Sequence, residues 1–288
     1  MQSRNPILTS SATFNGQAAR TYGHPGYPAS GTGYRGYAQP QGSPAGTDPS
    51  RWHYPTGGAV QEPMTIDSVV SRTALTLFIV VATAALTWVF LPDSLVPGEA
   101  NYVMPAWIGG ALLGAGIGML LSFRRTISAP LVVAYAVAEG VFLGAMSEWF
   151  DQFVYHGIVI EAVMGTMAAF IVTLAAYKFL NIQVTSGFRK WLNIVGMGFF
   201  VVVLGDFLIS MFGAEIGFNG FGPLGLIMSF VGLGLGVAFL IADFDMIERG
   251  VAAGAPDQES WRAAFALTAA LVLIYVELIR ILAIFQRS

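Results

Sequence analysis

The feature that most constrains this chain is a succession of seven apolar segments that begins near Thr73. A helix needs about 20 mostly apolar residues to cross the hydrocarbon core of a bilayer, and each segment is about that long. We therefore expect an all-α polytopic membrane protein with seven transmembrane helices in a compact bundle. The predicted spans are residues 71–92, 104–123, 129–150, 157–179, 191–213, 222–245 and 263–285.

The N-terminal part has a different composition from the rest. Hydrophobic residues make up 55% of the chain and charged residues only 11%, whereas a soluble domain carries about 25% charged residues. The first residues are instead rich in Gly, Pro, Ser, Gln and Tyr, without hydrophobic periodicity. Such a segment buries too little apolar surface to offset its ordering entropy. We expect residues 1–65 to be a disordered cytoplasmic tail and residues 66–288 to be the membrane domain.

The distribution of basic residues predicts the orientation. Most of them flank the even-numbered connections or the start of the first span: Arg72, Arg124, Arg125, Lys178, Arg189, Lys190, Arg249 and Arg262. The odd-numbered connections contain acidic residues but no Lys or Arg. By the positive-inside rule, the N-terminus of this multi-pass protein of the cell membrane should lie in the cytoplasm. Seven complete spans would put the C-terminus outside, whereas a re-entrant seventh segment would return it to the cytoplasm.

Acidic side chains inside the apolar segments give the main clue to function. There are five: Glu139, Asp206, Asp243, Asp245 and Glu277. A carboxylate at bilayer depth costs at least ~2.5 kcal/mol by insertion scales, so each should face protein or water. Arg280 is the only cation placed as clearly within a span. This imbalance predicts a path for protons or metal cations.

The depths of the five carboxylates can be compared from the helical rise of about 1.5 Å per residue. Glu139, Asp206 and Glu277 are predicted to share a layer near the middle of the membrane or slightly beyond it. Asp243 and Asp245 are predicted at the cytoplasmic end of the sixth span. The sequence thus predicts an acidic inner mouth and an acidic layer within the membrane.

Several of these residues also have structural interpretations. Glu277 and Arg280 are three apart on one helix face, so they can neutralise each other. Asp243 and Asp245 point to different faces, so one should face the bundle while the other faces the interface or pairs with Arg249.

Other polar and small residues leave two interpretations open. Glu139 could hydrogen-bond a neighbouring span instead of binding ions. Arg124 and Arg125 either determine topology or form a gating contact with Asp243 or Asp245. Glycines recur at intervals of four at Gly110, Gly114 and Gly118 and at Gly232 and Gly236. Such repeats allow close helix packing, with a dimerisation face or a hinge as the alternative.

Three segments together resemble a known family. They are Ala242-Asp243-Phe244-Asp245-Met246-Ile247, Met164-Gly165-Thr166-Met167-Ala168-Ala169-Phe170 and Tyr275-Val276-Glu277-Leu278-Ile279-Arg280-Ile281-Leu282. Their order and spacing are similar to the sixth, fourth and last spans of the Bax-inhibitor-like (transmembrane Bax inhibitor motif) family. The resemblance covers about residues 64–285, and the segment from Ala138 to Ser147 resembles the family's bacterial branch.

The resemblance implies a pH-sensitive calcium leak regulated by two buried aspartates. Asp245 matches the first of them, and the second would fall near Ala269 or Ala270, where this sequence departs from the family pattern. Glu277 is about 10 Å further along that helix. Calcium as the transported ion is then expected to contact Asp245 and Asp243, and we expect no cofactor.

The alternatives belong to other functional classes. A stress-response adaptor would act through the tail on membrane-protein partners without transport, and a proton-coupled transporter would carry a small solute. Gly205-Asp206 and Phe244-Asp245 resemble the aspartate motifs of intramembrane proteases, but Val203 replaces the expected glycine and the motif order is reversed. We therefore expect no enzymatic activity. The expected partners are the lipid bilayer and calcium or protons, and a net charge of -3 does not favour nucleic acid.

Overall fold

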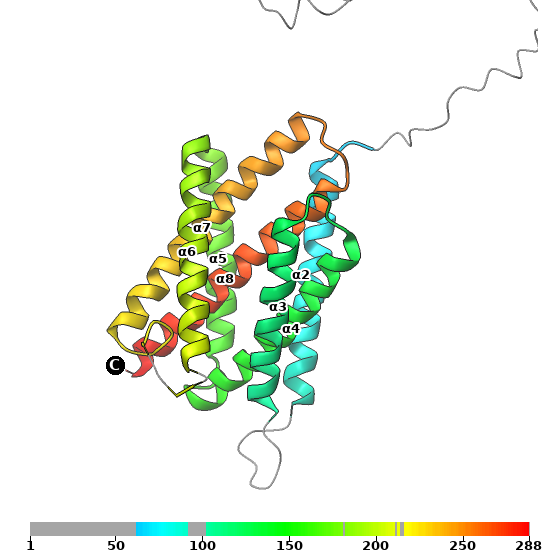
Figure 1. Cartoon of the computed structure of the whole chain (residues 1–288). Helices are drawn as coiled ribbons and strands as arrows, with labels where there is room; N and C mark the ends of the chain where they lie inside the picture. The colour runs from blue at the N-terminus through cyan, green and yellow to red at the C-terminus, as the bar shows by residue number, and fades with distance from the viewer. Residues whose placement is uncertain (1–61, 92–101, 181, 211, 214–215, 288) are drawn as a thin grey trace, which may run out of the picture. The chain divides into compact units, whose positions relative to one another are not determined.

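A computed structural model describes residues 62–91, 102–180, 182–210, 212–213 and 216–287, and seven α-helices form most of them (Figure 1). All seven are long and apolar enough to cross a membrane, which confirms the predicted fold class. Their bounds are α2 Ile66–Phe90, α3 Val103–Phe123, α4 Ala129–Phe153, α5 Ile158–Phe179, α6 Ser186–Ser210, α7 Pro223–Ala252 and α8 Glu259–Arg287.

Residues 1–61 of the predicted tail lie outside the described residues. Residues 62–65 were predicted to be disordered as well, but they are ordered and lead directly into α2. Thr65 is the N-cap of α2: its hydroxyl accepts from the Ser68 backbone N–H, and the Ser68 hydroxyl accepts from the Thr65 N–H. This reciprocal capping box satisfies N–H groups that the first turn of a helix leaves without partners.

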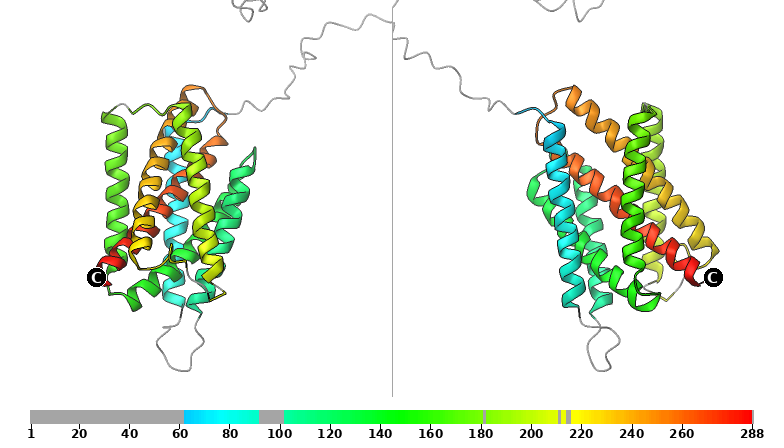
Figure 2. Two further views of the ribbon diagram at one scale, coloured as in Figure 1. Left: turned by 60° about the vertical axis from the view of Figure 1, so that its left-hand side comes forward. Right: turned by 180° about the vertical axis from the view of Figure 1, so that it is seen from behind.

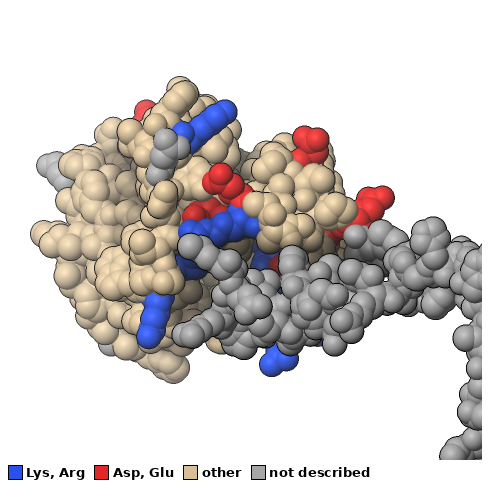
Figure 3. Space-filling view, turned by 90° about the horizontal axis from the view of Figure 1, so that it is seen from above, with Lys and Arg blue, Asp and Glu red and all other residues tan. Residues whose placement is uncertain are grey.

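Successive helices run in opposite directions, so the connections alternate between two ends of the bundle (Figures 1 and 2). We call the end that holds the start of α2 and the α3–α4, α5–α6 and α7–α8 connections the basic end, because the flanking Lys and Arg residues lie there. Figure 3 views this end and shows basic and acidic side chains gathered between two larger apolar parts of the surface. The opposite end is called the far end. Helix α8 runs the full distance and finishes at the far end, so the seventh segment is not re-entrant.

Helix α8 occupies the centre of the bundle and runs obliquely between the other helices (Figure 2). It packs against α7, α2 and α5 and less extensively against α4. Buried residues lie on every face of α8, from Ser260 to Ile284, as expected of a helix surrounded by protein. On one side, α2 and α3 both pack against α4. On the other side α5 packs against α7, and α6 packs closely against α7 alone among the described helices.

The glycine repeats lie at close contacts between helices. A Cβ atom at Gly110 on α3 would lie 2.6 Å from the backbone N of Phe142 on α4, and one at Gly118 would lie 3.2 Å from the Tyr135 ring. On α7, a Cβ atom at Gly236 would lie 2.6 Å from the Ile274 side chain of α8. These glycines therefore serve packing within the bundle, as the simpler of the two interpretations predicted.

Candidate functional site

Asp245 on α7 forms ion pairs with two arginines. Nη2 of Arg189, from the first turn of α6, donates to Oδ2 of Asp245 at 2.6 Å. Nε and Nη2 of Arg249, one turn further along α7, donate to Oδ1 at 3.1 and 2.9 Å. Arg249 also donates to the carbonyl oxygen of Val184 in the α5–α6 connection, at 2.7 Å. The buried Asp245 carboxylate therefore ties α6, α7 and this connection together, and its negative charge is paired with two guanidinium groups.

Helix α7 continues about 10 Å past Asp245, to Ala252. One interpretation of this region needs correction, and it concerns Arg124 and Arg125, whose side chains are exposed at the end of α3. Their backbone carbonyls accept from Arg262 at 3.5 and 2.7 Å. The guanidinium partners of Asp245 are thus not the two residues considered for a gating contact.

Asp243 lies on the opposite face of α7 from Asp245 and has a different environment. Its side chain is partly buried, and its Oδ2 atom is buried without a hydrogen-bond partner among the described residues. Phe244, between the two aspartates, packs edge-on against Phe170 of α5. The two carboxylates therefore do not form one acidic mouth, since one is held by arginines and the other is left with an unused acceptor.

Glu277 and Arg280 form the predicted ion pair on α8. Nη1 of Arg280 donates to Oε2 of Glu277 at 3.0 Å, and both residues are buried. Nη2 of Arg280 donates to the carbonyl oxygen of Phe218 in the α6–α7 connection at 2.8 Å. A Cβ atom at Gly232 would lie 2.6 Å from Oε1 of Glu277, so α7 leaves room for this carboxylate only because glycine stands there. The pair is neutral as a unit and links the centre of the bundle to a connection at the far end.

Glu139 is buried between α3 and α4. The Tyr135 hydroxyl, one turn earlier on α4, donates to its carboxylate. A Cβ atom at Gly114 of α3 would lie 2.8 Å from Oε1 of Glu139, and the Tyr135 ring meets Phe265 of α8 edge-on at 4.9 Å. No ion pair joins Glu139 to a basic residue in the described part of the chain. This hydrogen bond lies within α4, and no bond from Glu139 to a neighbouring span, one of the two interpretations, is formed among the described residues.

Asp206 anchors a connection and does not belong to a layer in the middle of the membrane. Its Oδ2 accepts from the backbone N–H of Asn219 at 2.7 Å, and the Asn219 side chain donates to the carbonyl oxygen of Val203 at 2.9 Å. Asp206 is only about 6 Å from the end of α6. Within the described residues, no hydrogen bond or ion pair joins Asp206, Glu139 and Glu277 to one another. The expectation that these three form one mid-membrane layer is therefore wrong for Asp206.

One buried acid, Glu148, is not among the five predicted from the sequence. Glu148 is buried on α4 and accepts from the Gln152 side chain one turn later. It was overlooked because it stands close to the end of the predicted span. Ala270, one of the two positions near which the resemblance would put a second aspartate, packs in a core cluster with Phe244. No group of three or more His, Cys, Asp or Glu suited to a metal ion occurs in the part of the chain that the structure describes.

Comparison with known proteins agrees with this architecture. The sequence matches the family model described as "Bax inhibitor 1 like" over residues 5–287, nearly the whole chain. A comparison with curated proteins found no match. The family match includes all seven helices and confirms the resemblance identified from the three motifs.

Proposed function

This chain belongs to the Bax inhibitor 1 like family, and on that basis we propose that it lets small cations, with calcium as the favoured ion, cross the membrane. The proposed membrane is the cell membrane, with the basic end in the cytoplasm. The seven apolar helices support a multi-pass membrane protein. The excess of basic residues at one end supports the orientation.

The observation that carries the proposal is the free acceptor on Asp243. A buried polar atom without a partner is costly, and an ionisable residue inside a membrane helix usually marks a functional site. Oδ2 of Asp243 is buried, and it has no hydrogen bond to any described residue. Calcium binds oxygen ligands and tolerates irregular coordination. We assign the cation contact to Asp243 and give Asp245 the separate role of holding α6 against α7.

Replacing Asp243 with Asn tests this assignment. We expect calcium flux into liposomes that contain the protein to fall about tenfold, which corresponds to ~1.4 kcal/mol of lost ion stabilisation. Glu248→Gln is the matched control: it removes an exposed carboxylate from the same helix, one that accepts only from the Tyr177 hydroxyl among the described residues. Equal flux through Asp243→Asn and wild type would rule out Asp243. If Asp245→Asn loses calcium flux while Asp243→Asn keeps it, the cation contact belongs to Asp245 and not to Asp243.

The dependence on pH is a second part of the proposal. Protons and cations compete for the same carboxylate oxygens, so we expect wild-type flux to be lower at pH 6 than at pH 8. Asp245 has two guanidinium partners and no carboxylate partner among the described residues, so a proton shared between two aspartates is not part of this mechanism. The flux measured at pH 6, 7 and 8 in wild type and in Asp243→Asn checks it. A wild-type flux that is the same at all three values would contradict the competition.

We propose no protease activity, because the two aspartates considered for it lie far apart. Asp206 is about 6 Å from the far end of α6, and Asp245 is about 10 Å from the end of α7 on the basic side. Asp206 holds the backbone of Asn219, and Asp245 holds two arginines. An aspartyl protease requires two carboxylates that share one proton, and these two residues are not placed to do so.

A further inference from the structure

The residues before α2 pair with the connection between α7 and α8. The backbone N–H of Met64 donates to the carbonyl oxygen of Ala255 at 2.7 Å, and that of Asp257 donates to the carbonyl oxygen of Glu62 at 2.9 Å. Pro63 and Pro256 stand opposite each other in this short antiparallel bridge. The two hydrogen bonds of the bridge join the neighbours of Pro63 and Pro256, so the pattern requires no backbone N–H from these two residues. Proline lacks a backbone N–H, so both prolines fit there without the loss of a hydrogen bond. We call residues 62–65, fastened in this way, the strap.

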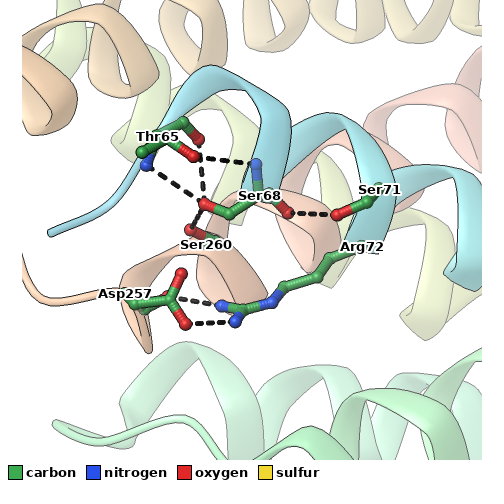
Figure 4. Close-up of polar contacts among 6 residues, drawn as sticks. All are labelled: Thr65, Ser68, Ser71, Arg72, Asp257 and Ser260. Carbon is green, nitrogen blue, oxygen red and sulfur yellow. Dashed lines mark hydrogen bonds and ion pairs between the residues drawn. The ribbon is translucent and has the colours of Figure 1, made fainter. Parts of the chain in front are cut away.

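Side chains from α2 reinforce the strap (Figure 4). The Arg72 guanidinium donates to both the carboxylate and the backbone carbonyl of Asp257. The same guanidinium lies over the Trp261 ring, 5.2 Å from its centroid. The Ser68 hydroxyl lies 2.7 Å from the Ser260 hydroxyl of α8. A charged, an aromatic and a neutral polar contact therefore join the start of α2 to the start of α8.

The strap also fixes the end of the helix that carries Asp243. Met64 is buried, and its sulfur would lie 3.2 Å from a Cβ atom at Gly250, near the end of α7. Helix α7 runs without a break from Asp243 to Ala252, and Ala255 follows it in the connection. The backbone N–H of Ala255 donates to the carbonyl oxygen of Gly250 at 3.0 Å, so a displacement at Ala255 also acts on the end of α7. Residues 1–61 immediately precede the strap in the chain. A partner that pulls on the N-terminal segment would therefore act on α7 through these few hydrogen bonds.

We propose that the fastened strap holds the basic ends of α2, α7 and α8 together and closes this end of the cation route, and that its release opens it. This inference rests on the proposed cation passage. The strap suits such a device because its backbone bonds are few and lie at a helix connection, where local opening costs less than opening of the core.

The test uses a disulfide across the strap. The chain contains no cysteine, so Pro63→Cys/Pro256→Cys introduces the only two thiols. Opposite residues in a pair of this kind have Cα atoms about 4.5 Å apart, within the range of about 4.4–6.8 Å that disulfides span. We expect the oxidised protein to pass calcium several-fold more slowly than wild type and reduction to restore the rate. Each single-cysteine variant is the control and should show no effect of oxidation.

The opposite change weakens the strap. Asp257→Asn removes the carboxylate charge that holds Arg72, so we expect this variant to pass calcium faster than wild type. When Asp257→Asn is added to the two-cysteine variant, we expect maleimide to label the reduced thiols faster. Failure of the cysteines to cross-link would overturn the pairing itself. Calcium flux that is unaffected by an efficiently formed disulfide would overturn the strap as a gate. Absence of flux in wild type, together with faster labelling in Asp257→Asn, would overturn the proposed function and leave strap opening supported.

Discussion

Replacing Glu277 with Gln is expected to destabilise the protein by about 3–5 kcal/mol, because it leaves Arg280 charged and buried without its partner. Glu277 is 1% exposed and Arg280 is 8% exposed, so water cannot replace the missing carboxylate. Gln has the shape of Glu and still fits the space beside Gly232, which confines the change to the charge. Unfolding of the purified protein in detergent measures the effect.

Two variants make this measurement specific. Glu259→Gln breaks another pair with the same spacing on the same helix, since Glu259 accepts from Arg262 at 2.6 Å. The side chains of that pair are 38% and 28% exposed, so its loss should cost no more than about 1 kcal/mol. The double variant Glu277→Gln/Arg280→Met removes the buried charge and should regain most of the lost stability. Equal stability of Glu277→Gln and Glu259→Gln would show that burial of the pair is not what makes it costly to break.

The second large effect is expected from Gly144→Ala on α4. A Cβ atom there would lie 2.5 Å from the carbonyl oxygen of Ala84 and 2.8 Å from Cβ of Thr87, both on α2. The nearest of these atoms belongs to the backbone, so α2 must move away from α4. We expect a loss of about 1–3 kcal/mol from overpacking, measured by unfolding in detergent.

Gly205→Ala provides the matched control for this substitution. Gly205 also lies inside a helix, α6, but a Cβ atom there would meet nothing within 4 Å. The higher helix propensity of alanine should then leave stability unchanged or raise it by up to about 1 kcal/mol. A loss of stability in Gly205→Ala equal to that in Gly144→Ala would contradict a packing origin.

The spans could be predicted closely because they depend on local composition. The predicted segment 104–123 corresponds to α3, Val103–Phe123, and segment 157–179 corresponds to α5, Ile158–Phe179. The bounds differ most where polar residues follow the apolar run. Helix α7 continues past Glu248 and Arg249 to Ala252 because hydropathy marks the apolar layer, whereas a helix can extend into water beyond it.

Predictions for the site succeeded where the partners are close in sequence. Glu277 and Arg280 are three apart, so helical geometry alone predicts their contact. Arg189 and Asp245 are 56 residues apart, and nothing in either segment indicates that α6 brings them together. The role of Asp206 was missed for the same reason, since its partner Asn219 lies in a connection whose path depends on the folded bundle.

The central position of α8 has a consequence for biogenesis. The helix with which α2, α5 and α7 complete their packing is made after the other six described helices, so those six enter the membrane before their common core exists. Until α8 arrives, the small-residue surfaces of α7 at Gly232 and Gly236 face lipid or other proteins. Because Glu277 and Arg280 neutralise each other within α8, this helix brings its own counter-charge when it inserts. Assembly of the bundle is therefore completed only after α8 has entered the membrane.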